Sequence, residues 1–300
     1  MTSVAARIVA SVFAVALLLH SPRVSAQNSG ATTRQIFASI SDDRSSPISD
    51  LTPADLIVKE DGKTREILAV EPAAGLLQVV VIVDDDGSGV FRYGLARFAE
   101  LLQGRAEISM RIIRGQAQEL FGFTKDADRW MAGIRLLGVR PPTPGGGQLL
   151  EGLADAAADL KRREAQRPVI VALTTGGGEQ SPLDGDRVLD GLRDSRASLH
   201  VVFAGSPLPK ALANKPSELL TGDYDLTHVL GDGPKETGGI RRDVIATQAV
   251  LTVVQQIARD LVMQMAITYV RPAGNNPRSL SVSSSRRGVK VVAPTRAPVR

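Results

Sequence analysis

The sequence predicts an α/β protein with a parallel sheet. Gln78 is the only polar residue in the run 77–83, and a strand this apolar on both sides belongs in the buried centre of a parallel sheet. Strand-length and helix-length segments then alternate from Leu77 to about Leu261, as βαβ units require. The acidic sequence Asp84-Asp85-Asp86-Gly87-Ser88 directly follows the first buried strand, where open α/β sheets place their ligand sites.

Residues 1–26 have the pattern of a secretory signal peptide. Arg7 precedes an apolar run at 8–19, and small residues follow at Val24-Ser25-Ala26. A charged start, an apolar middle and a small-residue cleavage site occur in this order in secretory leaders. We expect cleavage after Ala26 and a secreted or periplasmic protein. No segment of the mature chain is long and apolar enough to predict a transmembrane helix.

A small N-terminal β unit is expected at 34–72. Alternating polar and apolar residues at 35–40 predict its first strand. Glu60-Asp61-Gly62-Lys63 follows the apolar residues 56–58, and Asp-Gly between two strands is a strong hairpin signal. We expect the return strand at 66–70. A unit of this size does not bury a core alone.

The α/β domain itself is expected at 77–261. Apolar residues recur at helical spacing within each segment predicted to be a helix, and a loop rich in Pro and Gly is expected at 141–147. The predicted helices are 90–102, 126–137, 148–163, 186–196 and 244–261, and the further strands are 107–113, 119–123, 168–173 and 199–203.

Two regions near the end of the chain have less regular patterns. Residues 205–239 are rich in Pro, Gly and Asp and lack a sustained period, which predicts a long binding loop or an insertion. C-terminal strands are expected within 262–293. We predict that they pack with the N-terminal β unit, because pairing covers strand edges that would otherwise promote aggregation.

Charge and composition exclude some classes of function. Without the leader, 34 basic residues face 32 acidic ones, and seven basic residues with no acid gather at 271–300. Few aromatic residues accompany this basic end, so we expect a solvated edge and no nucleic-acid partner. Cysteine is absent, so disulfides and thiolate metal sites contribute nothing to the fold.

The order of several motifs resembles the von Willebrand factor A-related proteins of the type found in secreted proteins of Acidobacteria. The resemblance covers roughly residues 34–293 and implies a von Willebrand A-like, doubly wound sheet. It rests on the Glu60-Asp61-Gly62-Lys63 hairpin, the acidic loop at 84–88, Gly145-Gly146-Gly147 before a helix, Leu173-Thr174-Thr175-Gly176, and Thr237-Gly238-Gly239 followed by a helix and a strand that contains Tyr269.

The same resemblance implies a metal-ion site with Asp84, Asp86 and Ser88 as ligands. The chain departs from the family pattern at three positions: Asp86 replaces a serine, Gly147 a threonine and Thr175 an aspartate. We therefore predict a degenerate site that binds Mg²⁺ or Mn²⁺ weakly or not at all, with Thr143 and Thr175 as further candidate ligand-binding residues. In the degenerate case we expect Asp84 to accept backbone N–H bonds at the start of the helix predicted at 90–102.

An enzyme is not expected. A serine triad needs a histidine, and the mature chain has only His200 and His228. Ser88 lacks the sequence context of a nucleophile elbow, and no lysine follows the triple glycine as in a P-loop. The resemblance implies adhesion or protein–protein interaction, with a protein or a cell-surface polymer as the partner. The alternatives are a metal-dependent hydrolase that uses the acidic loop and a structural subunit of an envelope complex.

Overall fold

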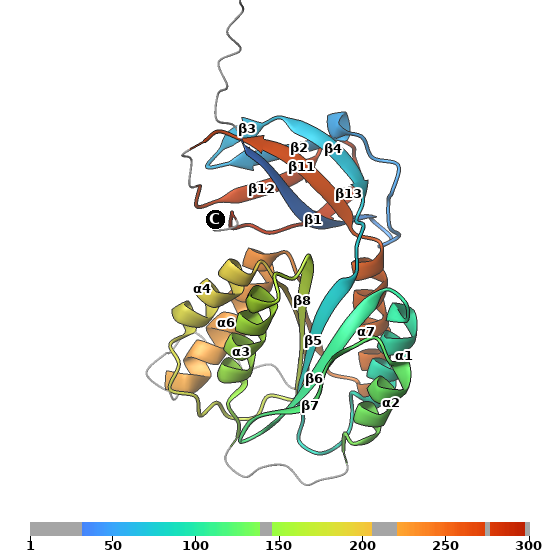
Figure 1. Cartoon of the computed structure of the whole chain (residues 1–300), viewed down its shortest axis with the longest axis vertical. Helices are drawn as coiled ribbons and strands as arrows, with labels where there is room; N and C mark the ends of the chain where they lie inside the picture. The colour runs from blue at the N-terminus through green and yellow to red at the C-terminus, as the bar shows by residue number, and fades with distance from the viewer. Residues whose placement is uncertain (1–31, 139–145, 206–220, 274–276, 298–300) are drawn as a thin grey trace, which may run out of the picture.

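The computed structural model describes residues 32–138, 146–205, 221–273 and 277–297. It shows an α/β unit and a smaller all-β unit stacked end to end (Figure 1). The α/β unit is one continuous segment, and the chain before and after it forms the β unit. No helix within the described ranges combines the length and the apolar character needed to cross a membrane. The predicted leader, residues 1–26, lies outside them.

The α/β unit is built on a six-stranded sheet. Its strands are β5 (Leu77–Asp84), β6 (Ala106–Arg114), β7 (Gln116–Thr124), β8 (Arg167–Thr174), β9 (Ser198–Ala204) and β10 (Arg241–Val244). They lie in the order β10-β9-β8-β5-β6-β7, and all pairs are parallel except β6 with β7. Numbered from β5, the order is 6-5-4-1-2-3, as in doubly wound sheets. The predicted fold class is confirmed.

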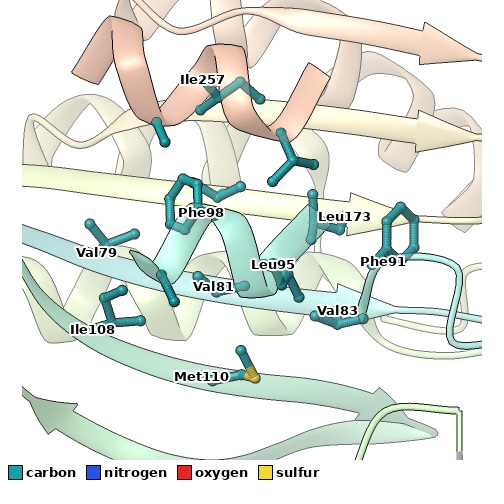
Figure 2. Packing of buried hydrophobic residues seen from close by; sticks show 14 of the residues in the cluster. Val79, Val81, Val83, Phe91, Leu95, Phe98, Ile108, Met110, Leu173 and Ile257 are labelled. Carbon is teal, nitrogen blue, oxygen red and sulfur yellow. The ribbon is translucent and has the colours of Figure 1, made fainter. Parts of the chain in front are cut away.

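Helices cover both faces of this sheet. They are α1 (Arg92–Leu102), α2 (Ala127–Arg135), α3 (Leu149–Arg162), α4 (Gly185–Ser195), α6 (Thr221–Thr237) and α7 (Thr247–Val262). Alternate side chains of β5 enter two separate cores, because successive strand residues point to opposite faces. Val79, Val81 and Val83 pack under α1, α2 and α7, where Phe98 and Ile257 close the cluster (Figure 2). The opposite face packs against α3, α4 and α6.

The β unit combines both ends of the described chain in two antiparallel sheets, β13-β1-β11-β4 and β12-β2-β3. Its strands are β1 (Thr32–Asp42), β2 (Leu56–Glu60), β3 (Lys63–Arg65), β4 (Ile67–Pro72), β11 (Met265–Arg271), β12 (Leu280–Ser284) and β13 (Val289–Val292), and η1 (Pro53–Asp55) is a short 3₁₀ turn. The predicted association of the N- and C-terminal segments is confirmed. They form two sheets around one core rather than a single sheet.

The predicted hairpin is present, with a different return strand. Glu60 pairs with Lys63, and Asp61 and Gly62 have positive φ values of 46° and 76°, as a type I′ turn requires. The strand that returns to β2 is β3. The expected return strand at 66–70 corresponds to β4, which pairs with β11 in the other sheet.

The prediction of a long irregular connection at 205–239 is wrong for its second half. Residues 206–220 lie outside the description, but α6 fills 221–237 and β10 follows it. Leu226, Val229 and Leu230 are buried at helical spacing. Gly233 lets the helix approach the sheet, because a Cβ there would lie 2.9 Å from Leu199 Cδ2. The Gly and Pro residues that hid the helix lower its intrinsic propensity, and packing compensates for them.

Candidate functional site

Asp84 and Thr174 end the two central strands at the point where the winding of the sheet reverses. They are partners in the β5–β8 register, and Thr174 Oγ1 donates a hydrogen bond of 2.7 Å to Asp84 Oδ2. Burial raises the pKa of Asp84, against the Thr174 hydroxyl, which lowers it. Open α/β sheets bind ligands in the crevice at this switch point. The structure therefore places Asp84 where a ligand site is expected.

Asp85 organises the acidic loop that follows. Its Oδ1 accepts from the N–H of Gly87 at 2.6 Å, and its Oδ2 accepts from the N–H of Gly89 at 3.1 Å. The prediction that Asp84 accepts the backbone N–H bonds before the helix is therefore wrong. Asp84 is the last residue of β5, and its carboxylate accepts a hydrogen bond from Thr174 of the neighbouring strand β8. Asp85 is the first residue after the strand, so its side chain can reach the N–H groups of the turn.

The other predicted ligand residues lie on or near the surface. Asp86 and Ser88 are exposed. Asp86 Oδ1 accepts from the N–H of Ser88 at 3.1 Å, and Ser88 Oγ accepts from the N–H of Val90 at 3.4 Å. Thr175 is half-buried, and its N–H donates to the backbone oxygen of Asp84 at 2.9 Å. Thr143 lies outside the described residues.

Two glycine-rich segments meet beside Asp84. The N–H of Gly147 donates to Gly178 O at 2.9 Å, and the N–H of Gln180 donates to Gly147 O at 2.8 Å. The contact needs glycine, because a Cβ on Gly146 would lie 2.0 Å from Gly178 O. These bonds join the start of α3 to the loop after β8. The Gly147 N–H is thereby occupied and does not face an anion.

The described residues do not fit the three-loop metal arrangement that the family resemblance implies. A Cβ on Gly147 would lie 2.3 Å from Ile113 Cγ2, so a threonine at this position would have to displace a core side chain. Within the part of the chain that is described, no three His, Cys, Asp or Glu side chains are grouped to hold an ion. Asp84 and Asp86 alone supply few of the oxygen ligands that Mg²⁺ prefers.

Glu179 also lies at this edge of the sheet, although no sequence pattern predicts it. It is buried, and its Oε2 accepts from the N–H groups of Leu149 and Leu150 at 3.0 and 3.2 Å. Burial raises the pKa of Glu179 to about 7, and the negative charge of Asp84 also raises it. Its own N–H donates to Asp223 Oδ1 at 2.8 Å. Glu179 thus caps α3 across the sheet edge, a contact that no local pattern signals.

Large apolar side chains are exposed at the same edge. Tyr93, in the first turn of α1, is 82% exposed, and Ile245, between β10 and α7, is 84% exposed. The helices α1 and α7 pack closely, because a Cβ on Gly94 of α1 would lie 3.3 Å from two side-chain carbons of Val254 of α7. Tyr93 lies just after the acidic loop that follows β5, and Ile245 directly follows β10, so both lie on the side of the sheet where the parallel strands end.

Comparisons with known proteins find likenesses of structure alone. No protein-family model and no curated protein matches the chain. A von Willebrand factor type A structure from Catenulispora acidiphila is 8% identical, with a TM-score of 0.49, and the match covers 90% of this chain and 75% of that one. An aerotolerance-related membrane protein from Bacteroides fragilis is 14% identical, with a TM-score of 0.42 and coverages of 62% and 99%. BatB from Bacteroides thetaiotaomicron is 11% identical, with a TM-score of 0.41 and coverages of 62% and 98%. At these identities and TM-scores the likenesses carry no argument about function.

Proposed function

We propose that this protein is an exported binding protein whose partner, another protein or a cell-surface polymer, contacts the carboxyl edge of the α/β unit. Export is proposed because residues 1–26 have the pattern of a secretory leader. Membership of the von Willebrand A-related proteins of Acidobacteria-type bacteria is proposed on the order of the motifs. The doubly wound sheet supports the proposed binding role, since the carboxyl ends of its parallel strands point away from the β unit and are free to meet a partner (Figure 1).

The observation that carries the proposal is the exposure of Tyr93 and Ile245 at the sheet edge that also carries the acidic loop. Single exposed apolar residues are common on protein surfaces, but these two are almost fully exposed and both lie at the carboxyl edge of the sheet. Aromatic and large aliphatic anchors surrounded by polar groups are typical of protein interfaces. Asp86 is also exposed at this edge, so a partner with an apolar centre and basic flanks is complementary to it.

The partner contact is proposed to be independent of a metal ion. The steric conflict at position 147 and the use of Asp86 and Ser88 within their own turn support a degenerate loop. We expect no appreciable rise in melting temperature when millimolar Mg²⁺ or Mn²⁺ is added. A bound ion at a hundredfold excess over its dissociation constant would stabilise the fold by about 2.7 kcal/mol.

The measurement is thermal denaturation with Mg²⁺ or Mn²⁺, with NaCl at equal ionic strength and with a chelator. Asp84→Asn is the matched variant, because it keeps the size of the side chain and its bond to Thr174 while removing the charge. A clear stabilisation by the ion in the wild type that disappears in Asp84→Asn would show a working metal site.

We also propose that the protein is not an enzyme. His200 is buried, and neither of its ring nitrogens has a partner. His228 lies on α6 within 3.3 Å of Asp186 and 3.2 Å of Asp232. In the described structure neither histidine hydrogen-bonds to a serine. The burial of His200 and the carboxylate contacts of His228 support a structural role for both. A turnover screen with and without chelator separates this proposal from the hydrolase alternative.

The binding proposal is tested by affinity capture from an extract of the cell envelope, with the mature chain as bait. We expect a stoichiometric partner for the wild type and at least a tenfold loss of capture by the double variant Tyr93→Ala/Ile245→Ala. Leu68→Ala is the matched control, because Leu68 is also an exposed apolar residue, 47% exposed, but lies on β4 in the other unit. Equal capture by wild type and double variant would contradict the proposed edge. Capture should also survive chelation.

A further inference from the structure

A cavity of about 220 Å³ lies between the two units, at the end of the parallel sheet opposite the candidate site. It is bounded by β1, the start of β8, the turn between α4 and β9, the end of α6 and the C-terminal segment. The cavity is larger than one water molecule needs. Among the described residues, five arginines and a single carboxylate line it: Arg34, Arg167, Arg193, Arg196, Arg296 and Glu236.

Arg167 is a buried cation without a carboxylate partner in the described residues. Its Nη1 donates to the carbonyl oxygens of Ala73 and Gly75 at 3.2 and 3.1 Å. Its Nη2 donates to the carbonyl oxygen of Leu261 at 2.8 Å and to Gln264 Oε1 at 3.3 Å. All four acceptors are neutral, and Nε is buried with no partner. Since the residue is only 5% exposed, burying its charge is costly. The four neutral acceptors and the Phe37 ring, whose centroid lies 5.5 Å from Arg167 Cζ, offset part of this cost, and an anion would offset more of it.

The lining carries further positive charge. Among the residues that the structure describes, Arg34 Nε is also buried without a hydrogen-bond partner, and neither Arg34 nor Arg196 forms an ion pair. Glu236 does not balance them, because its carboxylate already binds Arg193 Nη2 at 2.7 Å and Arg296 Nε at 3.3 Å. The excess of positive charge therefore comes from Arg34, Arg167 and Arg196.

We propose that this cavity binds a small oxyanion, a carboxylate or phosphate group of a small molecule, held by the guanidinium groups of Arg34 and Arg196 in the cavity that the buried Arg167 also lines. Guanidinium groups present planar N–H donors that match the oxygen geometry of carboxylates and phosphates. Within the described ranges Arg34 and Arg196 form no ion pair, so a bound anion would supply their missing counter-charge and would also compensate the charge of Arg167. Burial lowers the pKa of Arg167, and a bound anion opposes that shift. The site is independent of the proposed partner edge.

The test uses the full chain in phosphate-free buffer, with inorganic phosphate and citrate as probes and NaCl at equal ionic strength as the control. We expect saturable binding of at least one anion by isothermal titration calorimetry, and a rise in melting temperature of about 2–4 °C at tenfold excess over the dissociation constant. Arg34→Gln should weaken binding at least tenfold. Arg196→Asn should do the same, and asparagine tolerates the left-handed backbone at that residue, where φ is 57°.

Arg97→Gln is the matched control, because Arg97 is an exposed arginine of α1 that pairs with Glu100, and its binding should equal that of the wild type. Testing two cavity variants guards against one that misfolds, and circular dichroism checks both. Binding of phosphate alone or citrate alone supports the site and identifies the preferred oxyanion. The proposal is overturned if neither anion binds saturably beyond the NaCl control, or if binding is unchanged in both Arg34→Gln and Arg196→Asn.

Discussion

Glu60→Ala should lower the free energy of unfolding by about 3–5 kcal/mol. Glu60 is fully buried in the core of the β unit. Its Oε1 lies 2.6 Å from Arg271 Nη2 and accepts from the Tyr269 hydroxyl at 2.8 Å, and its Oε2 accepts from Arg65 Nε at 2.9 Å. Removing the carboxylate leaves Arg271, which is also buried, without its counter-charge. An uncompensated buried charge is among the most destabilising consequences of a single substitution.

The control is Glu66→Ala, which removes the same charge from an exposed position and should change stability by no more than about 0.5 kcal/mol. Glu60→Gln should be intermediate, because its amide oxygen keeps one side of the network and its amide nitrogen cannot accept from arginine. Chemical denaturation of the three variants provides the measurement. A loss below about 1 kcal/mol for Glu60→Ala would mean that water enters and solvates Arg271.

The second expected result concerns two buried groups whose pH dependences oppose each other. Burial lowers the pKa of His200 to about 4, and the charge of Arg242 also lowers it. Between about pH 6.5 and 4 the His200 imidazole is therefore protonated in the unfolded chain and neutral in the folded chain. The free energy of unfolding consequently falls as the pH falls through this range. The shift corresponds to about 3 kcal/mol.

Glu179 acts in the opposite direction. Its pKa is raised to about 7 from an ordinary value of 4.5, by burial first and also by Asp84. The folded chain holds a proton that the unfolded chain loses, so the stability contributed below pH 4.5 is lost as the pH rises towards 7. This shift also corresponds to about 3 kcal/mol. Between about pH 4.5 and 6.5 the two contributions nearly cancel.

Replacing either residue alone should therefore reveal a pH dependence of the free energy of unfolding that the wild type does not show. In His200→Leu the free energy of unfolding should fall as the pH rises from 4.5 to 7, and in Glu179→Gln it should rise from 4.5 to 6.5. Urea denaturation across this range measures both slopes. Leu68→Ala is the control, because it truncates an exposed side chain of β4 that does not titrate, and it should keep the wild-type profile. Variants with the wild-type slope would contradict the assigned pKa shifts.

The sequence predicts the strand framework well, because a strand that is buried on both faces is an uninterrupted run of apolar residues. The apolar run of β5, the parallel alternation and the Asp-Gly hairpin each depend on neighbouring residues. The helix α6 was missed because its glycines and proline obscure an apolar spacing of only three buried residues. Its stability comes from α4 and β9, which are distant in the sequence.

The candidate site was only partly predictable for the same reason. The position of Asp84 follows from the strand end. The choice between Asp84 and Asp85 as the loop acceptor depends on Thr174, which belongs to the neighbouring strand. Glu179 binds the start of α3 from the loop after β8, and Arg167 lies in a cavity formed by both units. Each of these roles depends on contacts that the fold creates between distant segments.

The two chain crossings between the units have a consequence for the order of folding. The N–H of Ala73 donates to Gln264 O at 2.8 Å, so the α/β unit begins and ends at adjacent points. Pairing β4 with β11 in the unfolded chain would first require closing a loop of roughly 190 residues, and pairing β1 with β11 an even longer one. Closing a loop of this length costs about 3 kcal/mol more than closing a ten-residue loop. If the α/β unit forms first, it brings these ends together by its own folding. The β unit should then assemble last, after the folded α/β unit has brought the two parts of the chain that form it together.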